Sequence, residues 1–153
     1  MPVPTDGMVT EARRGLEWRD EFKRGGTRVG ATRARQIVAK ENLSLDTVKR
    51  MNSYFARHEV DKSAKGFRPG EKGYPSAGRI AWALWGGDPG QRWAKAITER
   101  EKRKEMSNLI EALEVTRAAE AVSHANGLIR AGKISESRSW DGPSNAAENE
   151  YVE

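Results

Sequence analysis

The fold is organised by a tryptophan-rich stretch, SAGRIAWALWGGDP, at residues 76–89. The Ser76 hydroxyl is a good helix N-cap, so we expect a short and very apolar helix to begin after it. Gly86-Gly87 is expected to end that helix, because glycine is the usual residue just past a helix C-terminus. Asp88 and Pro89 then predict a new helix, with Asp88 as its N-cap and Pro89 at its first helical position.

Three tryptophans, Trp82, Trp85 and Trp93, fall within 12 residues. Trp82 and Trp85 are three residues apart, so they share one face of the predicted helix. Because each ring buries about 200 Å², we expect them at the aromatic centre of a small domain. The alternative is that they act as stacking platforms for single-stranded nucleic acid. Arg79 precedes Trp82 by three residues and is expected to stack on its ring.

Upstream of this stretch, apolar residues spaced by three and four predict three more helices. We expect them at residues 10–24, 27–41 and 44–58, beginning near Thr10, Thr27 and Ser44. Residues 1–9 are expected to form an irregular lead-in, and residues 59–75 a long polar loop. Residues 10–98 are thus predicted to be one Trp-rich helical domain, with a core of Trp18, Phe22, Ile37, Val48, Tyr54, Phe55, Ile80, Leu84, Trp85 and Trp93.

Residues 34–51 have the pattern of a helix-turn-helix. Ala39 is expected to face the second helix, Asn42 to take the left-handed position of the turn, and Leu43 and Val48 to point inward. The second helix would then enter the major groove. The predicted nucleic-acid-binding residues are Arg33, Arg35, Lys49, Arg50 and Arg57, and further outward candidates are Asp46, Thr47 and Ser53. The alternative is an ordinary corner between two core helices.

From Pro89 to Ala131 no proline interrupts the chain, which predicts a helix about 64 Å long at 1.5 Å per residue. Residues 99–105 are almost entirely charged, so the helix either bends back there or projects toward another chain. We expect residues 99–134 to form an extended helical arm and residues 135–153 an acidic, flexible tail. The predicted partner-binding residues are Leu109, Ile110, Leu113, Val115, Val122, Ile129 and Trp140.

The charge of the 153-residue chain is unevenly distributed. Residues 1–134 carry 26 Lys and Arg against 17 Asp and Glu, whereas residues 135–153 carry one Arg against five acids. A basic body predicts an acidic partner, such as nucleic acid or an acidic protein surface. No run of about 18 apolar residues is present, so we expect no membrane partner.

The sequence offers no constellation of catalytic residues. It has no Cys, and its two histidines, His58 and His124, lie 66 positions apart without a companion motif. The Gly-rich residues 25–30 lack the Lys-Ser/Thr pair of a phosphate-binding loop. We therefore expect that the protein is not an enzyme and that it holds no metal and no cofactor.

Several strings resemble a small α-helical module of tailed bacteriophage capsid-assembly cassettes, where it is found alone or appended to longer head proteins with a prohead-protease region. The most specific strings are FARH at residues 55–58 and LWGGD at residues 84–88, and the resemblance spans about residues 10–98. Residues 139–144 also resemble the start of a downstream segment in such longer chains. No protease body follows in this sequence, so the resemblance implies no proteolytic function.

This resemblance implies a virion or capsid-assembly protein without catalytic residues. Its expected partners are phage head or neck proteins in a homo- or hetero-oligomer, reached through the helical arm and the tail. Its expected location is the virion, and the host cytoplasm during assembly. The alternative function is DNA binding, through the helix-turn-helix-like segment or through nonspecific contacts of the basic body with phosphates.

Overall fold

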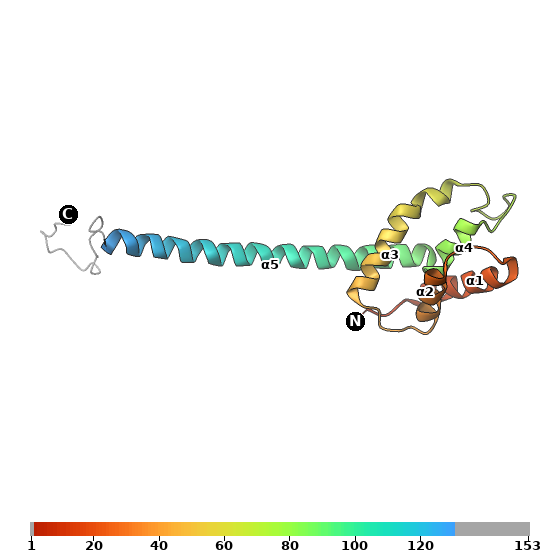
Figure 1. Cartoon of the computed structure of the whole chain (residues 1–153), viewed down its shortest axis with the longest axis horizontal. Helices are drawn as coiled ribbons and strands as arrows, with labels where there is room; N and C mark the ends of the chain where they lie inside the picture. The colour runs from red at the N-terminus through yellow and green to blue at the C-terminus, as the bar shows by residue number, and fades with distance from the viewer. Residues whose placement is uncertain (1, 131–153) are drawn as a thin grey trace, which may run out of the picture. The chain divides into compact units, whose positions relative to one another are not determined.

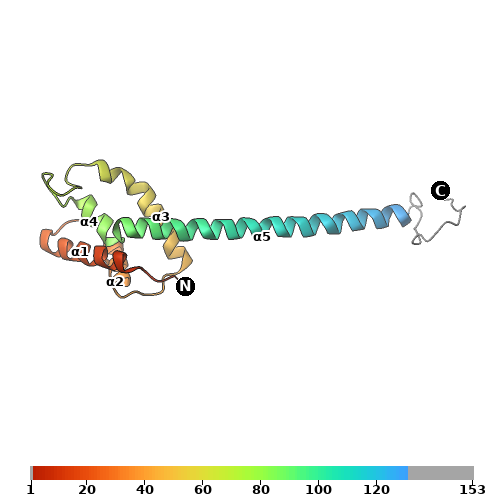
Figure 2. The same cartoon turned by 180° about the vertical axis from the view of Figure 1, so that it is seen from behind.

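A computed structural model describes residues 2–130 of the chain, and Figures 1 and 2 show its helices from opposite sides. The helices are α1 (Asp6–Phe22), α2 (Arg28–Val38), α3 (Leu45–His58), the short 3₁₀ helix η1 (Glu59–Ser63), α4 (Ala77–Leu84) and α5 (Gly87–Arg130). No strand occurs among the described residues. The prediction of an all-α fold is confirmed.

The described chain divides into two units, Met1–Arg103 and Lys104–Glu153. The first unit, here called the body, contains α1 to α4 and the first part of α5. In the second unit, the structure describes residues 104–130, all of them helical and part of α5. The helix continues through the charged residues 99–105 without a break. The expected tail, residues 135–153, lies outside the described residues.

The helix starts are set by hydroxyl caps. Thr27, Ser44 and Ser76 each accept a hydrogen bond from a backbone N–H in the first turn of α2, α3 and α4, as predicted. The prediction of an irregular lead-in up to residue 9 is wrong, because Thr5 caps α1 and the helix begins at Asp6. Met8, in the first turn, is completely buried, so apolar packing helps to fix this earlier start.

Trp82 lies at the centre of the core, with 1% of its surface exposed. Phe55 from α3 meets its ring edge-on at 4.8 Å between centroids, and Phe67 from the loop after η1 does so at 6.1 Å. Trp85 is also buried and Trp93 is partly buried against the same core. The expected aromatic centre is present, and burial leaves no room for Trp82 to stack on a nucleic-acid base.

The buried indole of Trp82 is tied to the start of α5 by a hydrogen bond. Its N–H donates to the Asp88 carboxylate at 2.9 Å. Lys62 of η1 pairs with the same carboxylate at 3.2 Å and lies over the Trp82 ring at 5.0 Å. Burial alone would raise the pKa of Asp88, but the indole N–H and the Lys62 ammonium outweigh it and lower that pKa. Asp88 thus joins α4, α5 and η1.

Arg79 does not stack on Trp82 as expected. Its guanidinium pairs with Glu11 of α1 at 3.1 Å and lies over the rings of Trp18 and Phe67, at 5.0 and 5.6 Å from their centroids. The ring of Trp82 is instead covered by Lys62. The ion pair and the contact with Trp18 fasten α4 to α1, and the contact with Phe67 joins α4 to the loop after η1.

Helices α1 and α4 approach each other closely at Gly15. A Cβ atom at this position would lie 2.8 Å from the backbone nitrogen of Leu84 and 3.0 Å from the Cβ of Ala83. Gly127 of α5, by contrast, has no neighbouring atom within 4 Å of such a Cβ. The two glycines therefore differ in packing while both lie in helices.

We predict opposite effects of alanine at these two glycines. Gly15→Ala is expected to lower the free energy of unfolding by about 1–3 kcal/mol, because the helix backbones must move apart. Gly127→Ala is expected to raise helix content, since alanine is favoured over glycine by about 0.5–1 kcal/mol in a helix. Thermal unfolding followed by circular dichroism measures both. Equal melting temperatures for Gly15→Ala and the parent would contradict the close approach.

We also predict that Asp88 makes stability depend on acid pH. The folded-state pKa of Asp88 lies below its ordinary value, so its ionised form stabilises the fold at neutral pH, and this contribution is lost as pH falls through that pKa. Asp88→Asn is expected to cost about 1 kcal/mol at pH 7 and less below about pH 4. Urea unfolding followed by tryptophan fluorescence at both pH values measures this difference. A cost that is the same at both values would count against the ionised pair.

Candidate functional site

A groove of about 830 Å³ opens on the body between α3 and the N-terminal ends of α2 and α4. Its α3 wall carries Lys49, Arg50, Ser53 and Arg57, and its floor includes Tyr54 and Trp85. The remaining lining residues are Gly26, Thr27, Val29, His58, Asp61, Ala77, Gly78 and Ala81. The groove combines an apolar floor with a cationic wall, and we call it the basic groove.

A column of stacked side chains forms the floor of the basic groove. The rings of Tyr54 and Trp85 are nearly parallel, at 4.5 Å between centroids and 9° between planes. His58 stacks on Tyr54 at 4.5 Å, and the Arg33 guanidinium lies 5.6 Å from the centroid of Trp85. Because these neighbours already occupy the ring faces of Tyr54, that ring is not a platform on which a nucleic-acid base stacks.

The cationic wall is built by the helical spacing of α3. Arg50, Ser53 and Arg57 follow one another at intervals of three and four, so they share one face of the helix. All three side chains are exposed, and Arg50 and Arg57 make no ion pair within the described part of the chain. The structure thus brings together Lys49, Arg50 and Arg57 of the predicted nucleic-acid-binding residues.

The other two predicted residues lie elsewhere. Arg35 is exposed and lines a separate hollow beside α1, with Arg19, Lys23 and Arg24. Arg33 was expected on a phosphate, but its side chain is 9% exposed and packs over Trp85. It donates a hydrogen bond to Gln36, and its Nε–H has no partner among the described residues. Burial, followed by the nearby charge of Arg50, lowers the pKa of Arg33.

The Tyr54 hydroxyl is a buried donor without a partner among the described residues. The side chain is 6% exposed and lines the basic groove. Burial and the negative charge of Asp61 raise the pKa of Tyr54, against the opposing effect of Arg57. The hydroxyl therefore keeps its proton, and its oxygen is buried away from solvent.

The N-terminus of α2 adds positive potential at the opposite wall. Gly26, Thr27 and Val29 line the basic groove there, and the first turn of α2 contains no acidic residue. The N-terminus of α4 is different, since Asp61 packs against Gly78 and pairs with His58 at 3.0 Å. The end of the groove at Arg50 and the N-terminus of α2 is therefore the more positive one. At the other end, the negative charge of Asp61 offsets the positive charge.

The turn between α2 and α3 differs from the expected helix-turn-helix. Six residues, 39–44, separate the two helices, whereas the motif has a turn of three or four. The left-handed residue is Lys40, with φ 53°, and not Asn42. The N–H groups of Lys40 and Glu41 bond to the carbonyls of Ile37 and Gln36, the pattern that ends a helix when the next residue turns left-handed.

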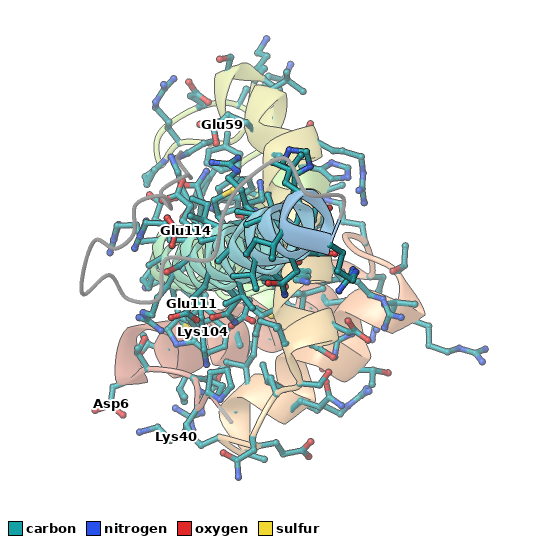
Figure 3. The ribbon with its side chains drawn as sticks, turned by 90° about the vertical axis from the view of Figure 1, so that its left-hand side faces the viewer. Asp6, Lys40, Glu59, Lys104, Glu111 and Glu114 are labelled. Carbon is teal, nitrogen blue, oxygen red and sulfur yellow. The ribbon has the colours of Figure 1, made fainter. Side chains whose placement is uncertain are left out.

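This pattern ends α2 at Val38 and places Ala39 as its exposed C-cap, so Ala39 does not face α3 as expected. Lys40 pairs with Asp6 at the start of α1 (Figure 3), which fastens the turn to α1. Leu43 and Val48 are buried, as predicted. The corner is thus held by contacts with α1 and the core.

The described part of the second unit carries six of the seven predicted partner-binding residues: Leu109, Ile110, Leu113, Val115, Val122 and Ile129. The side chains of Met106, Leu109, Ile110, Leu113, Val115 and Val122 are between 49% and 67% exposed, and Ile129 is partly exposed. Charged residues such as Lys104, Glu111 and Glu114 extend from the same helix (Figure 3). Trp140 lies outside the described residues.

Within residues 2–130, no group of three or more His, Cys, Asp or Glu side chains is arranged to hold a metal ion. None of the helices in that range combines the length and the apolar character that crossing a membrane requires.

We predict that removing the Tyr54 hydroxyl does not harm the fold. Tyr54→Phe is expected to leave the free energy of unfolding within about 1 kcal/mol of the parent or above it, because an unpaired buried hydroxyl is itself unfavourable. Tyr54→Leu is the control, and it is expected to cost about 0.5–1.5 kcal/mol for each lost ring contact in addition to lost packing. Urea unfolding distinguishes them. Equal destabilisation by both variants would mean that the hydroxyl has a partner.

No protein-family model, curated protein or solved structure matches this chain.

Proposed function

We propose that this protein is a non-enzymatic assembly protein that docks onto neighbouring subunits through residues 106–129 of α5. Following the resemblance of residues 10–98, we propose that the assembly is the head of a tailed bacteriophage. Its partners are then head or neck proteins, and its location is the virion, after assembly in the host cytoplasm.

The observation that carries this proposal is the uneven distribution of exposed apolar side chains. Six large hydrophobic side chains are exposed between Met106 and Val122, whereas Val3, Val29 and Val60 are the exposed ones described in the body. Covering apolar surface is worth about 25 cal/mol for each Å² removed from water. A helix with such a concentration of exposed apolar side chains is expected to bind a partner.

The apolar residues form two stripes on different faces of α5. Met106, Leu109, Ile110 and Leu113 lie on one face, which we call stripe 1; Val115, Val122 and Ile129 lie on another, stripe 2. At about 100° per residue, the centres of the two stripes are about 170° apart around the helix. One straight partner helix therefore cannot cover both stripes, and the arrangement favours contacts with two neighbours.

Nucleic-acid binding is the second candidate function. It is favoured by one observation, the gathering of Lys49, Arg50 and Arg57 along the basic groove. The six-residue turn before α3 and the covered faces of Tyr54 weigh against reading of bases by this surface. Contacts with phosphates are compatible with it.

We predict that stripe 1 is required for incorporation into particles. Leu109→Ser, Ile110→Ser and Leu113→Ser combined in the full chain should lower the number of copies per purified particle by at least about tenfold, since each buried interface side chain is worth about 1 kcal/mol or more. Quantitative mass spectrometry of the particles measures this number.

The matched control is Glu111→Ser with Glu114→Ser, which introduces serine on the same segment without removing apolar surface. It should leave the copy number unchanged, and both variants should melt like the parent body. Normal incorporation of the stripe 1 variant would contradict the docking proposal.

A further inference from the structure

The structure points to an occupant of the basic groove: we propose that the groove binds the acidic C-terminal segment of this chain, residues 135–153. This segment lies outside the described residues. The proposal concerns a different surface from the stripes of α5, so it does not depend on the proposed function.

The groove offers unused interactions for an anion. The Tyr54 ring lines the groove, while its hydroxyl is buried. Arg50 and Arg57 are exposed along the wall, and the N-terminus of α2 adds its dipole without an acid in its first turn. Carboxylates that enter the groove would pair with both guanidinium groups.

A buried cation strengthens this positive end. Arg33 lies beneath Trp85, and its only hydrogen bond from the side chain among the described residues goes to the neutral amide of Gln36. No acid within the described residues pairs with it, while Arg50 adds to the local positive charge. A buried charge without a counterion is unfavourable, so a nearby carboxylate lowers the energy of the folded body.

The composition of residues 135–153 complements the groove. The segment carries five acids and one Arg, and it interleaves the acids with Trp140, Tyr151 and Val152. The groove floor is built from Tyr54, Trp85, Ala77 and Ala81, which offers an apolar surface to such side chains. A nucleic-acid backbone would satisfy the cations but would leave this floor uncovered, and the bases find the faces of Tyr54 already occupied.

The absence of cysteine from the chain allows a direct test by disulfide trapping. Ser53→Cys places a thiol on the exposed wall of the groove, and Ser144→Cys places one in the acidic segment. The control pair combines Ser144→Cys with Thr10→Cys, an exposed position on α1. Full-length chains are oxidised under mild conditions, and the disulfide is scored on non-reducing gels and by mass spectrometry.

The proposal expects the groove pair to form its disulfide at least about tenfold faster than the control pair, because binding raises the local concentration of the segment. Arg50→Glu with Arg57→Glu should abolish this difference in rate, and Arg50→Lys with Arg57→Lys should retain it.

Changing the acids Glu148, Glu150 and Glu153 to Lys should also abolish the difference in rate. Combining these changes with the two Arg→Glu changes should restore the difference, because the charges are then complementary again. A disulfide within one chain or between two chains supports the proposal equally.

Equal rates for the groove pair and the control pair would overturn the proposal. In that case, binding of a fluorescent DNA oligonucleotide that depends on Arg50 and Arg57 would identify nucleic acid as the occupant. Circular dichroism of each charge variant shows that the body is folded. The stripe 1 variant keeps the groove intact. The number of copies per particle therefore tests docking through α5, and the rate of disulfide formation separately tests binding in the groove.

Discussion

The body depends on the hydrogen bond from the Trp82 indole to the Asp88 carboxylate. A ring of this size can be buried at the centre of a small domain only if its N–H finds an acceptor, and Asp88 supplies one at 2.9 Å. The carboxylate in turn requires a cation, which is Lys62. One side-chain triad thereby joins α4, α5 and η1, and it involves the Asp of the LWGGD string and the Lys that shortly follows FARH. The LWGGD string thus includes a residue, Asp88, that holds the core together.

Much of the fold was predictable because its signals are local. The caps Thr27, Ser44 and Ser76 and the apolar spacing of α3 depend on neighbours within one helical turn, and they were predicted correctly. The features that were missed depend on contacts distant in sequence. Arg79 finds Glu11 across the α1–α4 contact, and Lys40 turns left-handed where it meets Asp6, so neither arrangement is visible in the surrounding residues.

In the basic groove, too, the features set by local sequence were predictable, and those set by contacts distant in sequence were not. The shared face of Arg50, Ser53 and Arg57 follows from helical periodicity, and the sequence had singled out each of the three as a candidate for nucleic-acid binding. Arg33 looks like another surface cation in the sequence, yet the fold buries it under Trp85. Tyr54 was predicted as a core residue, which it is, but only the folded structure shows that its hydroxyl lacks a partner. The spacing of Tyr54 and His58 by four residues was the one available sign of their stacking.

The separation of the two apolar stripes on α5 has a consequence for stoichiometry. A subunit with one contact face terminates at its partner, whereas a subunit with two faces that point in different directions connects a pair of neighbours. If each stripe takes one neighbour, every copy of this chain acts as a cross-link, and the number of cross-links in the assembly grows with the number of copies. Such an assembly would resist mechanical load in proportion to the occupancy of its bridging sites, and partial occupancy would weaken it gradually.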